Sequence, residues 1–266
     1  MLQQAIDFRD ESEALFQLLA PLSDADFDRA TLFKDWTLND ILGHLHMWNW
    51  AADLSLQDGD AFLEFAASAM DDINSGSLRG FEAKWRDGVS GEKLRDAWRE
   101  FYLPMSERFA AADPKLRVKW AGPDMSVLSS ITARLMETWS HGQAVYDALG
   151  VERVNADRIK NIAVLGVNTF GWTHKNRGWD IPDPAPYVKL TAPSGDVWEW
   201  GDSGSGNAVE GLAEEFCQVV TQTRNVADTG IRTTGDVATQ WMSVAQCFAG
   251  PPEDPPGPGV RHRVVA

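Results

Sequence analysis

Residues 35–45, Asp-Trp-Thr-Leu-Asn-Asp-Ile-Leu-Gly-His-Leu, combine a helix start with a potential ligand. Thr37 and Asp40 have the spacing of a capping box, in which each side chain binds the other residue's backbone N–H. Apolar residues then recur with helical spacing through residues 41–56. The stretch therefore predicts a long helix that begins after Thr37 and carries His44 on its inward side.

The same periodicity recurs on both sides of this helix. It predicts further helices at about residues 2–19, 91–111, 126–149 and 155–173. Residues 60–87 are expected to form a shorter helix and a connector. Pro104 should kink the helix in which it lies, because proline lacks the N–H that the helix needs.

The composition changes after residue 180, where prolines gather at positions 182–186. Two short alternating runs around a Pro-Ser-Gly turn predict a β-hairpin at residues 187–200. A strand near Val209 and helices at about 212–223 and 237–248 should complete a small mixed module. The proline-rich end of the chain is not expected to form regular structure.

These patterns predict a mainly α protein of the α+β class. We expect a helical N-terminal domain over residues 1–180 and a small C-terminal α/β domain over residues 181–250. Residues 251–266 would form a proline-rich tail. At 266 residues the chain exceeds the usual length of one domain, which supports this division.

Charge and composition limit the possible partners. Lys and Arg number 24 against 39 Asp and Glu, giving a net charge of -15, which disfavours nucleic acid. No apolar run reaches the roughly 18 residues that a membrane span needs, and the polar N-terminus does not resemble a secretory signal. The two cysteines, Cys217 and Cys247, are expected to be buried free thiols. We therefore expect a cytoplasmic protein that binds neither nucleic acid nor a membrane.

Two acid–histidine pairs stand out because histidine is scarce, with five residues in the chain. His44 follows Asp40 by four positions, and His141 follows Glu137 by four, so each pair shares one helix face. Carboxylates and imidazoles on facing helices are a recurrent way to hold a metal ion. Such a pair can also be a simple ion pair. His46 lies on the other side of its helix and should not share a metal with His44.

Residues 35–45, together with Glu-Thr-Trp-Ser-His-Gly at 137–142, resemble the DinB-like superfamily and, within it, the mycothiol-dependent maleylpyruvate isomerase branch. The resemblance covers residues 1–150 well and the second half loosely, where the chain is most similar to an uncharacterised subgroup. It implies a DinB-like four-helix bundle in which His44, Glu137 and His141 bind a divalent ion. Zinc is expected, with nickel or manganese as alternatives. Asp40 is not a ligand in this pattern; it would cap its helix and could also orient His44.

The resemblance also implies a function. The metal would activate a low-molecular-weight thiol for isomerisation or S-transfer to a small electrophile, making the chain a metal-dependent thiol transferase or isomerase. Arg224 would hold a substrate carboxylate, although an ordinary surface arginine is the competing interpretation. Two other classes stay open: a metal-dependent hydrolase, and a non-enzymatic metal- or ligand-binding protein.

Other residues near these motifs have simpler expectations. Trp48, Trp50 and Trp139 could line a pocket, but aromatic residues at helical spacing favour a place in the core. His174 is expected to be an ordinary surface histidine.

Overall fold

The computed structural model describes residues 1–75 and 77–265. It divides into two compact units, Met1–Ala148 and Leu149–Ala266. The first unit is helical and the second combines helices with a small sheet, which confirms the predicted mainly α fold of the α+β class. Among the described residues, no helix combines the length and apolar character needed to cross a bilayer.

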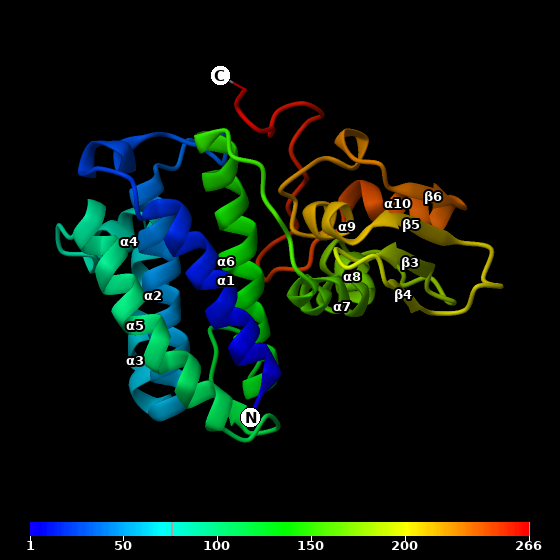
Figure 1. Ribbon diagram of the computed structural model, residues 1–266. Helices are drawn as coiled ribbons and strands as arrows, with labels where there is room; N and C mark the ends of the chain where they lie inside the picture. Colours follow the sequence, from blue (N-terminus) through cyan, green and yellow to red (C-terminus); the bar gives the residue numbers. More distant parts are fainter. Residues whose placement is uncertain (76, 266) are drawn as a thin grey trace. The chain divides into compact units, whose positions relative to one another are not determined.

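Four long helices form the bundle of the first unit. They run side by side in Figure 1 and are α1 (Gln3–Leu19), α2 (Leu38–Gln57), α5 (Gly91–Ala111) and α6 (Val127–Leu149). Their boundaries agree with those predicted from the apolar periodicity. Pro104 lies within α5, which continues on both sides of it. The core of the bundle contains large buried side chains, including Phe8, Trp98, Tyr102 and Trp139.

Two further helices pack against α2. They are α3 (Gly59–Ser75) and α4 (Leu78–Trp85), and both contact α2 as well as each other. Met47 of α2, Ala69 of α3 and Phe81 of α4 form a buried apolar cluster, with Trp48 and Trp85 packed against it. A short 3-10 helix, η1 (Asp24–Asp28), and a two-stranded ribbon of β1 (Arg117–Val118) and β2 (Met125–Ser126) complete the first unit.

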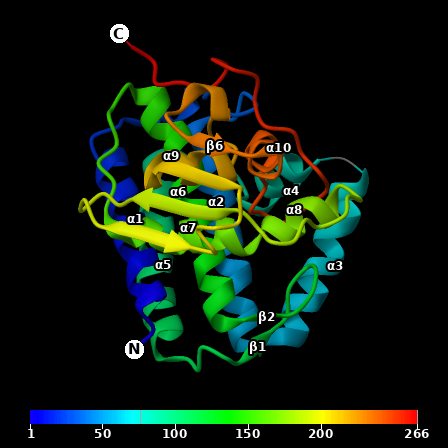
Figure 2. The same cartoon turned by 90° about the vertical axis from the view of Figure 1, so that its right-hand side faces the viewer.

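The second unit contains a four-stranded sheet with the order β4-β3-β5-β6, which can be followed in Figure 2. The strands are β3 (Tyr187–Thr191), β4 (Val197–Trp200), β5 (Ala208–Leu212) and β6 (Arg232–Thr234). β3 is antiparallel to β4 and parallel to β5, and β5 is antiparallel to β6. The predicted hairpin is therefore β3–β4, and the strand expected near Val209 is β5.

The helices of the second unit cover one face of this sheet. They are α7 (Lys160–Asn168), α8 (Phe170–Asn176), α9 (Ala213–Val220) and α10 (Asp236–Val244). The 3-10 helix η2 (Asp157–Ile159) directly precedes α7, and η3 (Val226–Asp228) lies between α9 and α10. α9 packs on β3 and β5, and α7 packs on α9. Val188 and Leu190 are buried, whereas Lys189 between them is exposed, as expected for a sheet with one covered face.

The boundary between the two units lies earlier in the chain than the change in composition suggested. Residues 149–180, which the sequence grouped with the helical bundle, lie in the second unit. The reason is local packing, because Gly166 of α7 lies directly against Phe216 and Val220 of α9. Residues 251–265 contain no helix or strand, in agreement with their proline content.

Candidate metal centre

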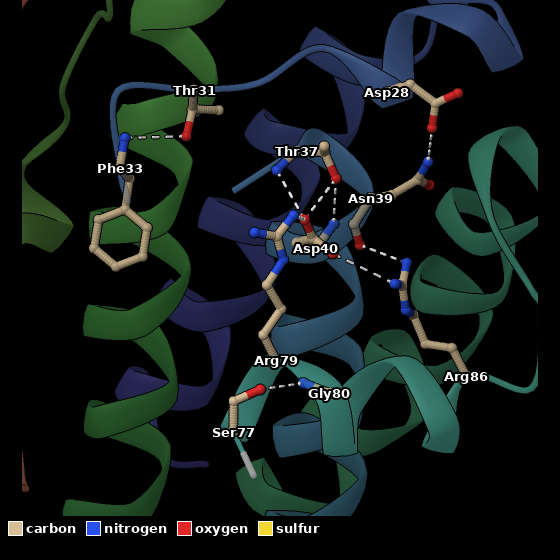
Figure 3. Close-up of polar contacts among 10 residues, drawn as sticks. All are labelled: Asp28, Thr31, Phe33, Thr37, Asn39, Asp40, Ser77, Arg79, Gly80 and Arg86. Atoms are coloured by element: carbon tan, nitrogen blue, oxygen red, sulfur yellow. Dashed lines mark hydrogen bonds and ion pairs between the residues drawn. The ribbon is translucent and has the colours of Figure 1, made fainter. Parts of the chain in front are cut away.

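The capping box at the start of α2 has the predicted geometry (Figure 3). The Thr37 hydroxyl accepts a hydrogen bond from the Asp40 backbone N–H at 3.1 Å, and the Asp40 carboxylate accepts one from the Thr37 N–H at 2.9 Å. Both otherwise unpaired N–H groups are therefore satisfied. The cap fixes where α2 begins, and with it the direction in which His44 points.

The three predicted ligands converge between α2 and α6. His44 Nε2 lies 3.4 Å from Glu137 Oε2, and His141 Nε2 lies 3.1 Å from the same oxygen. One donor atom from each residue lies within 4.8 Å of the others. Donors bound to one tetrahedral zinc at about 2.1 Å are separated by about 3.4 Å. The spacing and the donor set of two imidazoles and one carboxylate thus fit a single divalent cation.

Aromatic side chains before α2 enclose this cluster. The Trp36 ring is parallel to the His141 ring within 7°, with centroids 5.7 Å apart, and it also contacts His44 edge-on. Phe33 meets His141 edge-on at 4.9 Å. Between these two aromatics, Lys34 and Asp35 have φ values of 52° and 56°, a left-handed backbone that costs such residues energy. The strained loop therefore holds two aromatic rings over one imidazole.

A fourth side chain in this region, Glu82, was missed by the sequence analysis. It comes from α4, and its Oε1 lies 2.7 Å from His44 Nδ1. The same oxygen accepts a hydrogen bond from Trp48 Nε1 at 3.0 Å. Glu82 is 2% exposed, so this carboxylate lies in the interior of the unit. An ionised carboxylate can only accept, so Nδ1 of His44 carries a proton and Nε2 faces Glu137.

Burial and neighbouring charges shift the pKa values of the three candidate ligands. Burial lowers the pKa of His44, but the Glu82 and Glu137 carboxylates outweigh it and raise that pKa to about 9. Burial likewise raises the pKa of Glu137, yet hydrogen bonds from His141 and His44 hold it well below its usual value. Burial and the nearby charge of His44 lower the pKa of His141. In the metal-free centre the carboxylates and the His44 imidazolium therefore stabilise one another's charged forms.

A buried arginine adjoins the cluster. Arg134 lies one turn before Glu137 on α6 and is 3% exposed. Its Nε donates to Asn49 Oδ1 of α2 at 2.9 Å. Burial lowers its pKa to about 10, although the charges of Glu137 and Glu82 oppose that change. Arg134 therefore supplies a positive charge close to the carboxylates of Glu137 and Glu82.

Asp40 does not contact His44. Its carboxylate is occupied by Thr37 and by ion pairs with Arg79 at 2.6 Å and Arg86 at 3.5 Å. The suggestion that Asp40 orients His44 directly is therefore wrong, and Glu82 occupies that position. Asp40 caps α2, as the capping-box spacing predicted.

The remaining histidines lie outside the cluster. His46 packs edge-on against Trp85 and Phe101. His174, in the second unit, is only 1% exposed, and its Nδ1 donates to the Phe170 carbonyl at 2.9 Å. The expectation that His174 lies at the surface is wrong, because the contact with Phe170 and packing against Trp179 bury it.

The tryptophans near the motifs differ in their roles. Trp139 is fully buried, in agreement with a place in the core. Trp50 packs against Phe65 and Trp85 and does not contact the ligands. Trp48 does contact them, because it lies beside His44 and donates to Glu82.

Arg224 and both cysteines belong to the second unit. Arg224 is half-buried just after α9, and its Nη1 donates to the Thr223 carbonyl at 2.9 Å. Cys217 and Cys247 are free and buried, as predicted. Burial and the proximity of Cys247 raise the pKa of the Cys217 thiol well above its usual value.

Comparisons with known proteins agree with the fold and with the motifs. The protein-family model described as the mycothiol maleylpyruvate isomerase N-terminal domain matches residues 8–146 of this chain. Uncharacterised proteins from two strains of Mycobacterium tuberculosis are each 36% identical over 246 residues, covering 92% of this chain and 95% of theirs.

Two solved structures have a similar fold. They are a mycothiol-dependent maleylpyruvate isomerase, with a TM-score of 0.54, and a mutant of that enzyme, with a TM-score of 0.55. Each is 14% identical in sequence, and each alignment covers 87% of this chain and 91% of the other. Through the domain match and the 36% identical relatives, the chain belongs to the DinB-like, mycothiol-dependent maleylpyruvate isomerase-type family.

Proposed function

We propose that this chain is a metal-dependent enzyme that activates a low-molecular-weight thiol for isomerisation of, or S-transfer to, a small electrophile. The convergence of His44, Glu137 and His141 carries the proposal. Three protein donors are typical of a catalytic zinc, whereas structural zinc sites usually have four. The Glu137 side chain is 24% exposed, against 10% and 11% for the two histidines, so the cluster is accessible on its carboxylate side.

In this proposal the three side chains hold the ion in fixed geometry. A bound zinc, or nickel or manganese in its place, would lower the pKa of a coordinated thiol and so supply a thiolate near neutral pH. Trp36 and Phe33 restrict water around His141, which strengthens the electrostatic interactions within the centre.

The reacting thiol would come from a cosubstrate. Both cysteines of the chain are buried in the second unit, and the Cys217 thiol is held protonated by its surroundings. The similar solved structures are of a mycothiol-dependent enzyme, which makes mycothiol the first thiol to test. The electrophile would be a small molecule.

Cobalt substitution tests this function. Cobalt(II) in place of the native ion makes thiolate binding visible, because thiolate-to-cobalt charge transfer absorbs in the near ultraviolet. We expect mycothiol or another cellular thiol to produce this band in the wild-type protein. Glu137→Gln should weaken metal binding by more than the roughly 10–100-fold typical of residues that only support a ligand.

A Cys217→Ser/Cys247→Ser variant is the control, and it should give the same band as the wild type. An intact cobalt site that gives no band with any physiological thiol would contradict the proposal. Turnover of an ester or amide without thiol would then indicate a hydrolase, and ligand binding without turnover would indicate a binding protein.

We also propose that Arg224 binds a carboxylate of the electrophile, a role supported by the family resemblance. Arg224→Gln should raise KM for an anionic electrophile by about tenfold or more, because a charge-assisted hydrogen bond contributes about 1.5–3 kcal/mol. The cobalt–thiolate band should not change. Arg232→Gln, at an exposed position of β6, is the matched control. An unchanged KM in Arg224→Gln would exclude this role.

A further inference from the structure

Helix α4 lies outside the four-helix bundle but makes polar contacts along one side of α2. Arg79, Glu82 and Arg86 follow one another at spacings of three and four residues, so they share one face of α4. On α2, the residues that meet this face are Asp40, His44 and Trp48, each four positions after the last. Along α4, Arg79 and the C-cap residue Arg86 therefore lie on either side of Glu82, and both pair with Asp40, one turn before His44 on α2.

The flanking contacts fix α4 in place (Figure 3). Arg79 pairs with the Asp40 carboxylate at 2.6 Å. Arg86 donates to the Asn39 carbonyl at 3.0 Å and lies 3.5 Å from Asp40. Both arginines thus contact the first turn of α2, which the capping box has already ordered. The capped end of α2 therefore holds α4 in position through the two arginines, and α4 carries Glu82.

Resting on the proposed metal centre, we propose that Glu82 is a positioning residue that sets the orientation and tautomer of His44. With Nδ1–H donated to Glu82, Nε2 is the ring nitrogen that is directed at Glu137 and is left to bind a metal ion. A ligating histidine commonly donates its other ring N–H to a carboxylate, which fixes the ring and increases its basicity. Asp40 contributes by capping α2 and by pairing with Arg79 and Arg86.

Glu82 is placed to support the centre and not to join it. It contacts Nδ1, whereas the atoms shared with Glu137 are on the Nε2 side of the ring. Its Oε1 accepts from both His44 and Trp48, so two donors fix the carboxylate. Glu82 is 2% exposed, so water cannot readily take the place of its hydrogen bond to His44. Loss of that bond would therefore leave a buried polar group unpaired, which costs free energy.

The test is Glu82→Gln, which keeps the size of the side chain and removes its charge. Zinc affinity is measured by competition with a chelator, and we expect a loss of roughly 10–100-fold. Glu64→Gln, at an exposed position of neighbouring α3, should keep the wild-type affinity. Glu82→Asp, which restores the charge, should recover part of the loss. Circular dichroism before metal addition shows whether each variant is folded.

A second readout does not need the metal. In protein with nitrogen-15-labelled histidine, the Nδ1–H proton of His44 should resonate far downfield, because it is in a short hydrogen bond to a carboxylate. The signal is assigned by its loss in His44→Ala, and it should shift upfield or disappear in Glu82→Gln.

Wild-type zinc affinity in Glu82→Gln together with an unchanged His44 resonance would overturn the inference. If the wild type itself binds no metal, the proposed function fails. The resonance then still decides whether Glu82 orients His44.

Discussion

His44 and His46 lie on the same helix but have different surroundings. They are two residues apart and so about 200° apart around the axis of α2. His44 meets Glu137 and Glu82, whereas His46 lies against the rings of Trp85 and Phe101. A difference of two positions therefore separates a candidate ligand from a packing residue.

This difference predicts unequal effects on metal content. His44→Ala should lose the metal, because two remaining donors cannot hold the ion in place. His46→Ala should keep one equivalent of metal per chain. The cavity left by the ring should lower the free energy of unfolding of this variant by about 1–3 kcal/mol. Metal analysis of the purified, folded variants measures both. Similar losses in the two variants would show that His46 contributes to the centre.

The candidate ligands could be proposed from the sequence, but the residues around them could not. His44, Glu137 and His141 belong to two local motifs, and the family resemblance implied that they act together. Glu82 lies 38 positions from His44, and no local pattern specifies which side of α4 faces α2. The only signal was the row of Arg79, Glu82 and Arg86 on one helix face, which is also typical of a solvated surface.

At the scale of helices, a glycine permits the contact between α2 and α4. A Cβ placed on Gly43 would lie 2.4 Å from Cδ and 2.8 Å from Nε of Arg86. The Arg86 side chain therefore crosses α2 where that helix has no side chain. This close approach explains a glycine within a helix, where it normally costs about 1 kcal/mol relative to alanine.

Gly43→Ala should consequently displace Arg86 and loosen α4. We expect zinc affinity to fall several-fold, and the gain in helix propensity to be cancelled by the clash. Chelator competition and urea unfolding measure the two effects. Gly171→Ala is the control, because its Cβ would meet Ile181 at an ordinary 3.5 Å. A Gly43→Ala variant that is about 1 kcal/mol more stable than the wild type, with unchanged zinc affinity, would contradict this prediction. It would show that Arg86 can move aside without loosening α4.

A second helix pair is joined by a carboxylate. Glu13 of α1 accepts hydrogen bonds from Arg99 Nε at 2.8 Å and from the Tyr102 hydroxyl at 2.5 Å, both on α5. Burial raises the pKa of Glu13, but Arg99 and Tyr102 outweigh it and hold that pKa below 4.5. The stabilisation is therefore complete above pH 4.5 and is lost as the pH falls through the lower, folded-state pKa.

Glu13→Gln should lower the free energy of unfolding by about 1 kcal/mol at pH 7. It should also reduce the dependence of stability on pH below about 4.5. Urea unfolding at a series of pH values measures both effects. Asp10→Asn, at an exposed position of the same helix, should change neither appreciably. A wild-type pH dependence in Glu13→Gln would mean that other carboxylates dominate acid unfolding.

For the whole molecule, most elements but not their grouping could be predicted. Apolar periodicity located the long helices and the hairpin within one or two residues, because it reports which face is buried. It does not report which neighbour buries that face. Residues 160–176 therefore appeared to extend the bundle, although α7 packs on α9 of the second unit.

The division into two units also predicts where metal removal acts. All three candidate ligands, and Glu82, belong to Met1–Ala148. A ligand that binds only the folded state stabilises it by about 2.7 kcal/mol at 100 times its Kd. Chelation should therefore accelerate amide hydrogen exchange in α2, α4 and α6. The strands β3 to β5 of Leu149–Ala266 should keep their exchange rates.

Hydrogen exchange followed by mass spectrometry resolves these segments in the intact chain. His44→Ala is the control, since chelator should not alter its exchange in either unit. Equal acceleration in the bundle and in the sheet of the wild type would indicate that the two units unfold as one. Acceleration confined to the sheet would place the metal in the second unit and would contradict the assignment of His44, Glu137 and His141 as ligands.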